Sequence, residues 1–226
     1  MILPYAREID YDKLMDSLNS EILEYDPLPL INQLQNDSEN EYPFRVLIGT
    51  VLSSRTKDEV TAQATEKLFK RASDPYTLSG ISEEEIEKLI YPVGFYRIKA
   101  RNIKNIARIL IEEYKGEVPD SMDSLTKLPG VGRKTANLVL ATAFNIDTIT
   151  VDTHVHRISN RIGIVKTTVP VETEQDLMKV VPKKYWISLN TYLVLHGQNV
   201  CKPISPWCSK CRIFSLCRRV GVDRFR

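Results

Sequence analysis

The chain has 226 residues, of which 42% are hydrophobic and 27% are charged, so it is not a disordered protein, which combines low hydrophobicity with a high net charge. No apolar run approaches the roughly 18 residues of a membrane-spanning helix, and residues 1–5 lack the basic start and apolar stretch of a secretion signal. We therefore expect a cytoplasmic protein without a membrane partner. We also expect a compact monomer, because nothing in the sequence marks an oligomer interface.

The charges are unevenly distributed along the chain, although the formal net charge is only +2. Residues 1–40 hold 2 basic and 9 acidic residues, whereas residues 201–226 hold 7 basic residues and 1 acidic residue. Such an asymmetry predicts either that the two ends pack together or that the basic end meets a polyanion. A solvated basic tail is an equally ordinary explanation.

Helical periodicity dominates the sequence. Apolar residues recur three and four positions apart, and strands do not alternate with helices, so we expect an all-α fold. Asp58 and Ser82 are predicted to cap the helices that follow them. Helices are expected over residues 11–25, 44–52, 58–71, 83–91, 96–114, 121–128, 133–144, 153–162, 172–180 and 183–197.

The helix over residues 96–114 is predicted to be amphipathic. Its basic residues, which could form a nucleic-acid face or a solvated one, should lie mostly away from the core. The predicted inner face consists of Ile98, Ile103, Ile106, Ile109 and Leu110.

The segment from Leu128 to Lys134 has the sequence L-P-G-V-G-R-K between two predicted helices. Two glycines around one residue allow a tight turn whose N–H groups point outward, and such a turn at a helix N-terminus binds phosphate without reading bases. A plain corner between two helices, with Gly as the C-cap, is the alternative.

Lys134 lies in the first turn of the next helix beside Arg133, where the helix dipole and the neighbouring charge favour the neutral amine that attacks carbon. A lysine that only contacts phosphate is the competing interpretation.

The segment V-D-T-H-V-H-R begins at Val151. Asp152 stands where a helix should start, so it is either an N-cap or a catalytic carboxylate that moves protons and stabilises positive charge. Asp152, His154 and His156 could instead ligate a metal ion, as in a metallohydrolase. The remaining histidine, His196, is expected to be a buried or capping residue.

All four cysteines lie in the last 26 residues, in the pattern C-x6-C-x2-C-x5-C. A cytosolic protein has little use for disulfides, so this spacing indicates a metal site. Zinc and an iron–sulfur cluster both accept four thiolates, and the spacing does not choose between them. The four residues are Cys201, Cys208, Cys211 and Cys217.

Taken together, the hairpin motif, the V-D-T-H segment and the cysteine pattern resemble the endonuclease III family of DNA glycosylases, within the helix–hairpin–helix superfamily. The resemblance extends from about Phe44 to Cys217. It implies a six-helix barrel with the helix–hairpin–helix motif over residues 36–146. It also implies a second helical domain, formed by residues 1–35 and 147–226, whose four cysteines hold a [4Fe–4S] cluster.

The implied activity is base-excision repair of double-stranded DNA that contains damaged pyrimidines or abasic sites. The resemblance makes Lys134 the nucleophile that displaces the base from C1′, and Asp152 the residue that assists proton transfer and offsets positive charge. The resulting Schiff base undergoes β-elimination, so the enzyme is both glycosylase and lyase. Relatives that only excise the base lack this lysine. The cluster is implied to be structural or to sense DNA.

The resemblance also implies which residues contact DNA. Arg55 stands where the family has a glutamine that fills the gap left by the extruded base. Arginine can fill the same gap and hydrogen-bond guanine, and a simple contact with a phosphate is the alternative. Phe95 matches a second wedge position, although a core aromatic is the alternative. The loop between the first two cysteines has fewer basic residues than in the bacterial enzyme. The remaining expected contacts come from Gly130, Val131, Gly132, Arg133 and His154.

Two further functions stay open beside the metallohydrolase. A mismatch glycosylase of the same fold would act on uracil or thymine opposite guanine, which Arg55 favours and Lys134 disfavours. A non-enzymatic DNA-binding iron–sulfur protein would leave the pair Lys134 and Asp152 without a role.

Overall fold

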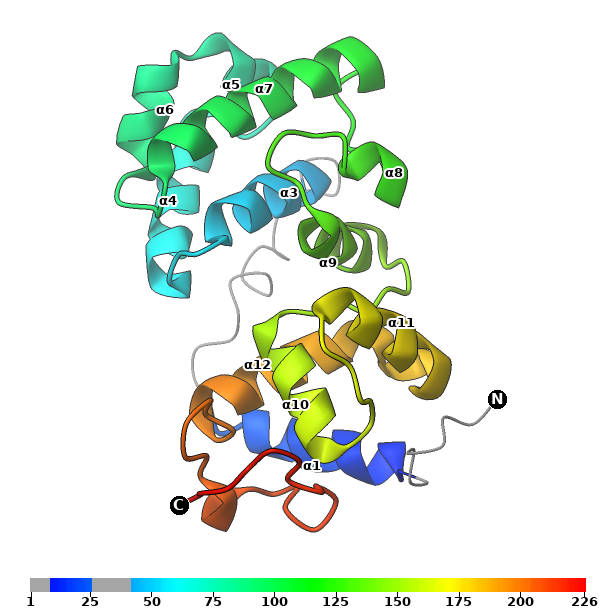
Figure 1. The fold of residues 1–226 in the computed structure, drawn as a ribbon. Helices are drawn as coiled ribbons and strands as arrows, with labels where there is room; N and C mark the ends of the chain where they lie inside the picture. The colour runs from blue at the N-terminus through cyan, green and yellow to red at the C-terminus, as the bar shows by residue number, and fades with distance from the viewer. Residues whose placement is uncertain (1–8, 26–41) are drawn as a thin grey trace. The chain divides into compact units, whose positions relative to one another are not determined.

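The computed structural model of the protein describes residues 9–25 and 42–226. Within these ranges the chain forms helices joined by turns, with no strand, which confirms the all-α prediction (Figure 1). The described residues divide into two compact units, one of residues 42–146 and one of residues 9–25 with 147–226. The predicted domain boundary between residues 35 and 36 lies outside the described residues. None of the helices in these ranges is long and apolar enough to cross a membrane.

The unit of residues 42–146 is arranged around helix α3 (Tyr42–Ser53). This helix is buried from Phe44 to Leu52 except at Arg45, as expected of a helix that is apolar on nearly all sides. It packs against α4, α7 and α9, and α7 in turn packs against α5 and α6 (Figure 1). The bounds are α4 (Asp58–Arg71), α5 (Pro75–Gly80), α6 (Glu83–Ile90), α7 (Tyr96–Tyr114), α8 (Met122–Leu125) and α9 (Arg133–Phe144).

The helix starts follow capping chemistry, with one correction. Ser82 caps α6 as predicted, since its side chain accepts a hydrogen bond from the Glu85 N–H at 3.1 Å. The residue before α4 is Lys57, which makes no side-chain capping bond, and Asp58 is the first helical residue instead of the predicted cap. There its negative charge faces the positive end of the helix dipole. Asp74, which the periodicity did not single out, forms a full capping box with Thr77 at the start of α5.

Helix α7 differs from its predicted orientation at two adjacent residues. Ile103, Ile106 and Leu110 are fully buried as expected, but Ile98 is 58% exposed and Lys99 is only 7% exposed. The Lys99 ammonium group donates hydrogen bonds to the Leu52 carbonyl at 2.8 Å and to Thr56 Oγ1 at 3.1 Å. Burial lowers the pKa of Lys99 to about 8, although hydrogen bonds to the charged form oppose that shift. A lysine is buried here because it satisfies carbonyls at the C-terminal end of α3.

The second unit joins the N-terminal helix α1 (Tyr11–Ile22) to the C-terminal part of the chain. Tyr192 donates a hydrogen bond to Asn19 at 3.0 Å, and Arg212 forms an ion pair with Glu24. The acidic and basic ends therefore pack together, one of the two outcomes that the charge asymmetry predicts. The other elements are α10 (Thr153–Ile162), α11 (Pro170–Val180), η2 (Lys183–Tyr185), α12 (Trp186–Asn199) and η3 (Cys208–Lys210).

Two isoleucines of α7 test the orientation of this helix. Ile103→Ala should lower the free energy of unfolding by about 2–5 kcal/mol, because it leaves a cavity in the core. Ile98→Ala, on the same helix and with the same chemical change, should alter that free energy by only about 0.5 kcal/mol. Urea denaturation followed by circular dichroism measures both. Equal losses would show that Ile98 is buried and that the predicted face was right.

Candidate functional site

The turn between α8 and α9 contains two glycines with different physical roles. Gly130 has φ of +81°, and a Cβ at this position would lie 2.6 Å from Asn102 Nδ2. Gly130 is therefore required by the protein's own packing. Gly132 has an ordinary φ of −94°, and a Cβ there would meet nothing within 4 Å. No contact within the described residues of this unit requires glycine at position 132, and the absence of a side chain leaves the turn open to solvent.

The N-terminus of α9 provides the chemistry expected of an anion site. Gly132 occupies the N-cap position and offers no side chain to the first N–H groups of the helix, which have no carbonyl partner within the helix itself. Val131 behaves differently from its predicted DNA contact. Its side chain is 5% exposed and belongs to the core, and its N–H donates to the Leu128 carbonyl at 3.1 Å. Val131 fixes the turn from inside, while both glycines are exposed.

Lys134 lies in the first turn of α9 and is exposed, as is Arg133. The opposite side of this helix carries Ala136 and Val139, which are fully buried and hold the helix against the core. The periodicity of α9 thus turns Lys134 toward solvent, where it can reach an external substrate.

Asp152 is the N-cap of α10. Its Oδ1 atom accepts hydrogen bonds from the His154 and Val155 N–H groups, both at 2.8 Å. The capping interpretation is therefore confirmed, and it is compatible with a chemical role because the cap fixes the carboxylate in one place. Asp152 belongs to the second unit, and Lys134 belongs to the unit of residues 42–146.

The metallohydrolase interpretation of Asp152, His154 and His156 does not hold. His154 Nδ1 lies 3.2 Å from an Arg157 nitrogen, whereas His156 Nδ1 lies 2.6 Å from Thr173 Oγ1 on α11. The three side chains therefore have separate partners. Among the residues described, no three His, Cys, Asp or Glu side chains are grouped to hold a metal ion.

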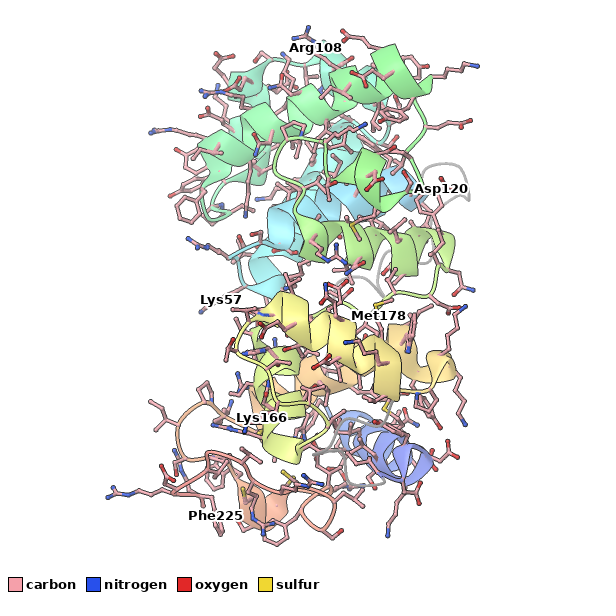
Figure 2. The ribbon with its side chains drawn as sticks, turned by 45° about the vertical axis from the view of Figure 1, so that its right-hand side comes forward. Lys57, Arg108, Asp120, Lys166, Met178 and Phe225 are labelled. Atoms are coloured by element: carbon pink, nitrogen blue, oxygen red, sulfur yellow. The ribbon has the colours of Figure 1, made fainter. Side chains whose placement is uncertain are left out.

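The four cysteines line one hollow in the second unit. Cys201 follows α12, Cys208 begins η3, and Cys211 and Cys217 lie in the turns after it. None of the four forms a disulfide. The C-terminal end of the chain folds against this region, where the ring of Phe225 meets that of Phe214 at a centroid distance of 6.3 Å (Figure 2).

Two residues contact these cysteines in a way that the sequence analysis did not predict. Arg161 of α10 donates to Cys201 Sγ at 3.3 Å and to the Lys202 carbonyl at 2.7 Å. His196 is fully buried as expected, with Nδ1 2.6 Å from Glu21 and Nε2 3.9 Å from Cys211 Sγ. Nothing in the sequence distinguishes Arg161 from other basic helix residues, and only the helix packing reveals its role.

These neighbours change the chemistry of the thiols. Burial by itself raises the pKa of Cys201, but hydrogen bonds from His196 and Arg161 outweigh it and lower that pKa. Burial raises the pKa of Cys208 and of Cys217. A positive charge on a bound metal would offset this burial cost and hold all four sulfurs as thiolates.

Arg55, Phe95 and Gly130 surround one open hollow of about 220 Å³ in the unit of residues 42–146. Phe95 is 59% exposed, which excludes its interpretation as a core aromatic. The Arg55 guanidinium lies over the Phe95 ring, 5.8 Å from its centroid. The structure thus brings the two predicted wedge residues together beside the hairpin. Exposed Ile98 also lines this hollow, which explains its departure from the buried face.

Comparison with known proteins agrees with this arrangement. Residues 48–183 match the family described as HhH-GPD superfamily base excision DNA repair protein. The chain is 47% identical over 200 residues to Endonuclease III of Thermotoga maritima, covering 87% of this chain and 94% of that protein. It is 42% identical over 177 residues to Endonuclease III of Bacillus subtilis, covering 78% and 81%.

Solved structures are similar over most of the chain. A trapped Endonuclease III–DNA covalent intermediate matches with a TM-score of 0.79 and 37% identity, covering 92% of this chain and 94% of that one. A thermostable thymine-DNA glycosylase matches with a TM-score of 0.77 but only 24% identity, so that likeness concerns the fold alone.

Two substitutions separate the capping role of Asp152 from its charge. Asp152→Ala should lower the free energy of unfolding by about 0.5–2 kcal/mol, because two N–H groups of α10 lose their acceptor. Asp152→Asn keeps an acceptor oxygen and should be close to neutral. Denaturant unfolding measures both, and an Asn variant as unstable as the Ala variant would contradict the capping geometry.

Proposed function

The chain belongs to the helix–hairpin–helix superfamily of base-excision DNA repair proteins, and from that premise we propose that it removes oxidised pyrimidines from double-stranded DNA and cleaves the abasic site that results. Its Endonuclease III homologues make it a DNA glycosylase and abasic-site lyase. One observation carries the choice of the bifunctional chemistry, namely an exposed lysine in the first turn of the hairpin helix α9.

The proposed reaction begins when the damaged nucleotide is extruded from the duplex. The Lys134 amine attacks C1′ of the deoxyribose, so that a C1′–nitrogen bond forms while the bond to the base breaks. Asp152 accepts the proton that the attacking amine loses and offsets the positive charge that develops on the sugar. The sugar ring then opens: the C1′–O4′ bond breaks as the lysine nitrogen forms a C1′=N Schiff base, and O4′ takes up the proton that Asp152 had accepted. Loss of a proton from C2′ of this Schiff base breaks the bond to the 3′ phosphate by β-elimination.

The grip on DNA is proposed to come from the backbone of the hairpin. Gly130 and Gly132 expose main-chain groups at the N-terminus of α9, and Arg133 adds a positive charge beside them. Such contacts position a phosphate without selecting a sequence, as a repair enzyme requires. The predicted contact of His154 stays a prediction, because its ring packs against Arg157 and the backbone of Gly197. One active site meets one lesion, so we propose a monomer that acts at the nucleoid in a prokaryotic cell.

The four cysteines are proposed to hold a [4Fe–4S] cluster. They fit that group because they line one hollow, and Arg161 and His196 supply hydrogen-bond donors to the sulfurs. When bound, the cluster would supply four iron–thiolate bonds that cross-link the segment of residues 201–217. The excision chemistry depends on protein side chains alone.

A mismatch glycosylase of the same fold is the second candidate. The observation in its favour is Arg55, whose exposed guanidinium could pair with O6 and N7 of a guanine left without its partner. Lys134 counts against it, because simple base release needs no amine nucleophile.

Borohydride trapping tests the lyase chemistry. Wild-type protein mixed with a duplex that carries one thymine glycol should form a reduced protein–DNA adduct, and Lys134→Gln should form none, because the amine of the Schiff base is gone. Lys127→Gln removes an exposed lysine before the same hairpin and should trap like the wild type. Base release without an adduct would make the enzyme monofunctional. Release only from guanine mismatches would favour the second candidate.

Metal analysis tests the cluster. The purified protein should contain iron and inorganic sulfide in equal amounts, and Cys208→Ser should lose most of both, because one of the four ligands is removed. Ser209→Ala, which alters the exposed neighbour of Cys208, should keep the wild-type content. Zinc without sulfide in the wild type would overturn the proposal.

A further inference from the structure

Lys99 is a buried charge to which the proposed reaction assigns no role. Its ammonium group donates to the Leu52 carbonyl and to Thr56 Oγ1, and also to the Ser54 carbonyl. These three acceptors lie on both sides of Arg55 in one short segment, residues 52–56, which runs from the last turn of α3 into the connection to α4. All three donors of the lysine are therefore used on the segment that carries the predicted wedge residue.

Arg55 and Phe95 both have a backbone conformation that is costly for residues with a side chain. Their φ angles are +54° and +58°, in the left-handed region. That conformation is unfavourable for a residue with a Cβ atom and persists only where the surroundings enforce it. Hydrogen bonds to Lys99 immediately before and after Arg55 supply such an enforcement.

The same lysine connects the two wedge segments. Thr56 Oγ1, which accepts from Lys99, also accepts from the Gly94 N–H at 3.2 Å. Gly94 lies so close that an added Cβ would be 2.7 Å from the Arg55 carbonyl oxygen. Lys57, the residue that follows this segment, is labelled in Figure 2. One threonine oxygen thus joins the segment of Arg55 to the segment of Phe95.

We propose that Lys99 is a positioning residue that holds Arg55 and, through Thr56 and Gly94, Phe95 in the geometry needed to enter the duplex. This inference rests on the proposed function. Lys99 is only 7% exposed on the wall of the hollow that Arg55 and Phe95 line, and its ammonium group points at carbonyls, so it acts through the wedge residues.

Lys104 provides a matched control on the same helix. Its Nζ donates a hydrogen bond to the Ile81 carbonyl at 2.8 Å. This bond is of the same type, but it holds the connection between α5 and α6, which does not include Arg55. Lys104→Met removes a charge and a carbonyl partner from α7 as Lys99→Met does, but it leaves the wedge segments untouched.

The experiment uses a duplex with 2-aminopurine, a fluorescent base, opposite a stable abasic-site analogue. Insertion of a wedge unstacks this base and raises its fluorescence. Wild type and Lys104→Met should give the full rise, and Lys99→Met should give less than half of it, as should Arg55→Ala. The single-turnover excision rate of Lys99→Met should fall by about tenfold or more, since small misplacements of contact groups are costly. Its affinity for undamaged duplex should change by less than about twofold, because the hairpin backbone is intact.

A double-mutant cycle distinguishes positioning from a general structural effect. If Lys99 acts through the two wedge residues, Lys99→Met should add no further loss in a protein that already carries both Arg55→Ala and Phe95→Ala. Additive losses, or a Lys99→Met variant that behaves like Lys104→Met, would overturn the inference. Should Lys99→Met fail to fold, Thr56→Val decides the question, since it removes only the shared oxygen and should still reduce the fluorescence rise. If the wild type neither excises a base nor raises the fluorescence, the proposed function itself fails.

Discussion

The burial of helix α3 is the constraint on which the rest of its unit depends. This helix is apolar on nearly all sides, so helices α4, α7 and α9 must cover it. This packing holds α9 with Ala136 and Val139 toward the core, and Lys134 therefore faces solvent. The same packing buries the C-terminal end of α3, whose carbonyls need a hydrogen-bond donor, and the Lys99 ammonium group is that donor. The proposed nucleophile and the wedge segment are thus both consequences of packing around one helix.

The second unit also has an apolar core, but polar contacts hold its proposed site residues in place. Asp152 begins α10 by accepting two N–H groups, and Arg161 near the end of the same helix holds the start of the cysteine segment. A single helix of ten residues therefore carries a candidate catalytic carboxylate at one end and a thiol contact at the other. His196 lies between Glu21 of α1 and Cys211, so the N-terminal helix also supports the proposed cluster site. The proposed cluster would stabilise this arrangement without taking part in excision.

The two glycines of the hairpin have different roles, which the sequence motif alone does not reveal. The sequence places two glycines in the hairpin but treats them alike. The structure shows that Gly130 is needed for the fold, because of its positive φ and the nearness of Asn102, whereas nothing in its own unit requires Gly132. The absence of a side chain at Gly132 fits the close approach of an external partner, which we propose to be the DNA backbone.

The sequence by itself determined the all-α fold, most helix bounds, the cap at Asp152 and the candidate site residues, because these depend on local periodicity, local hydrogen bonding and specific motifs. The helices over 96–114 and 133–144 were predicted to the residue. Only the tertiary structure decided that Ile98 is exposed and Lys99 buried, because the choice depends on carbonyls 47 and 45 residues earlier in the chain. It also decided that His154 and His156 have separate partners and that Arg161 contacts Cys201, since side chains distant in sequence meet only after the helices have packed.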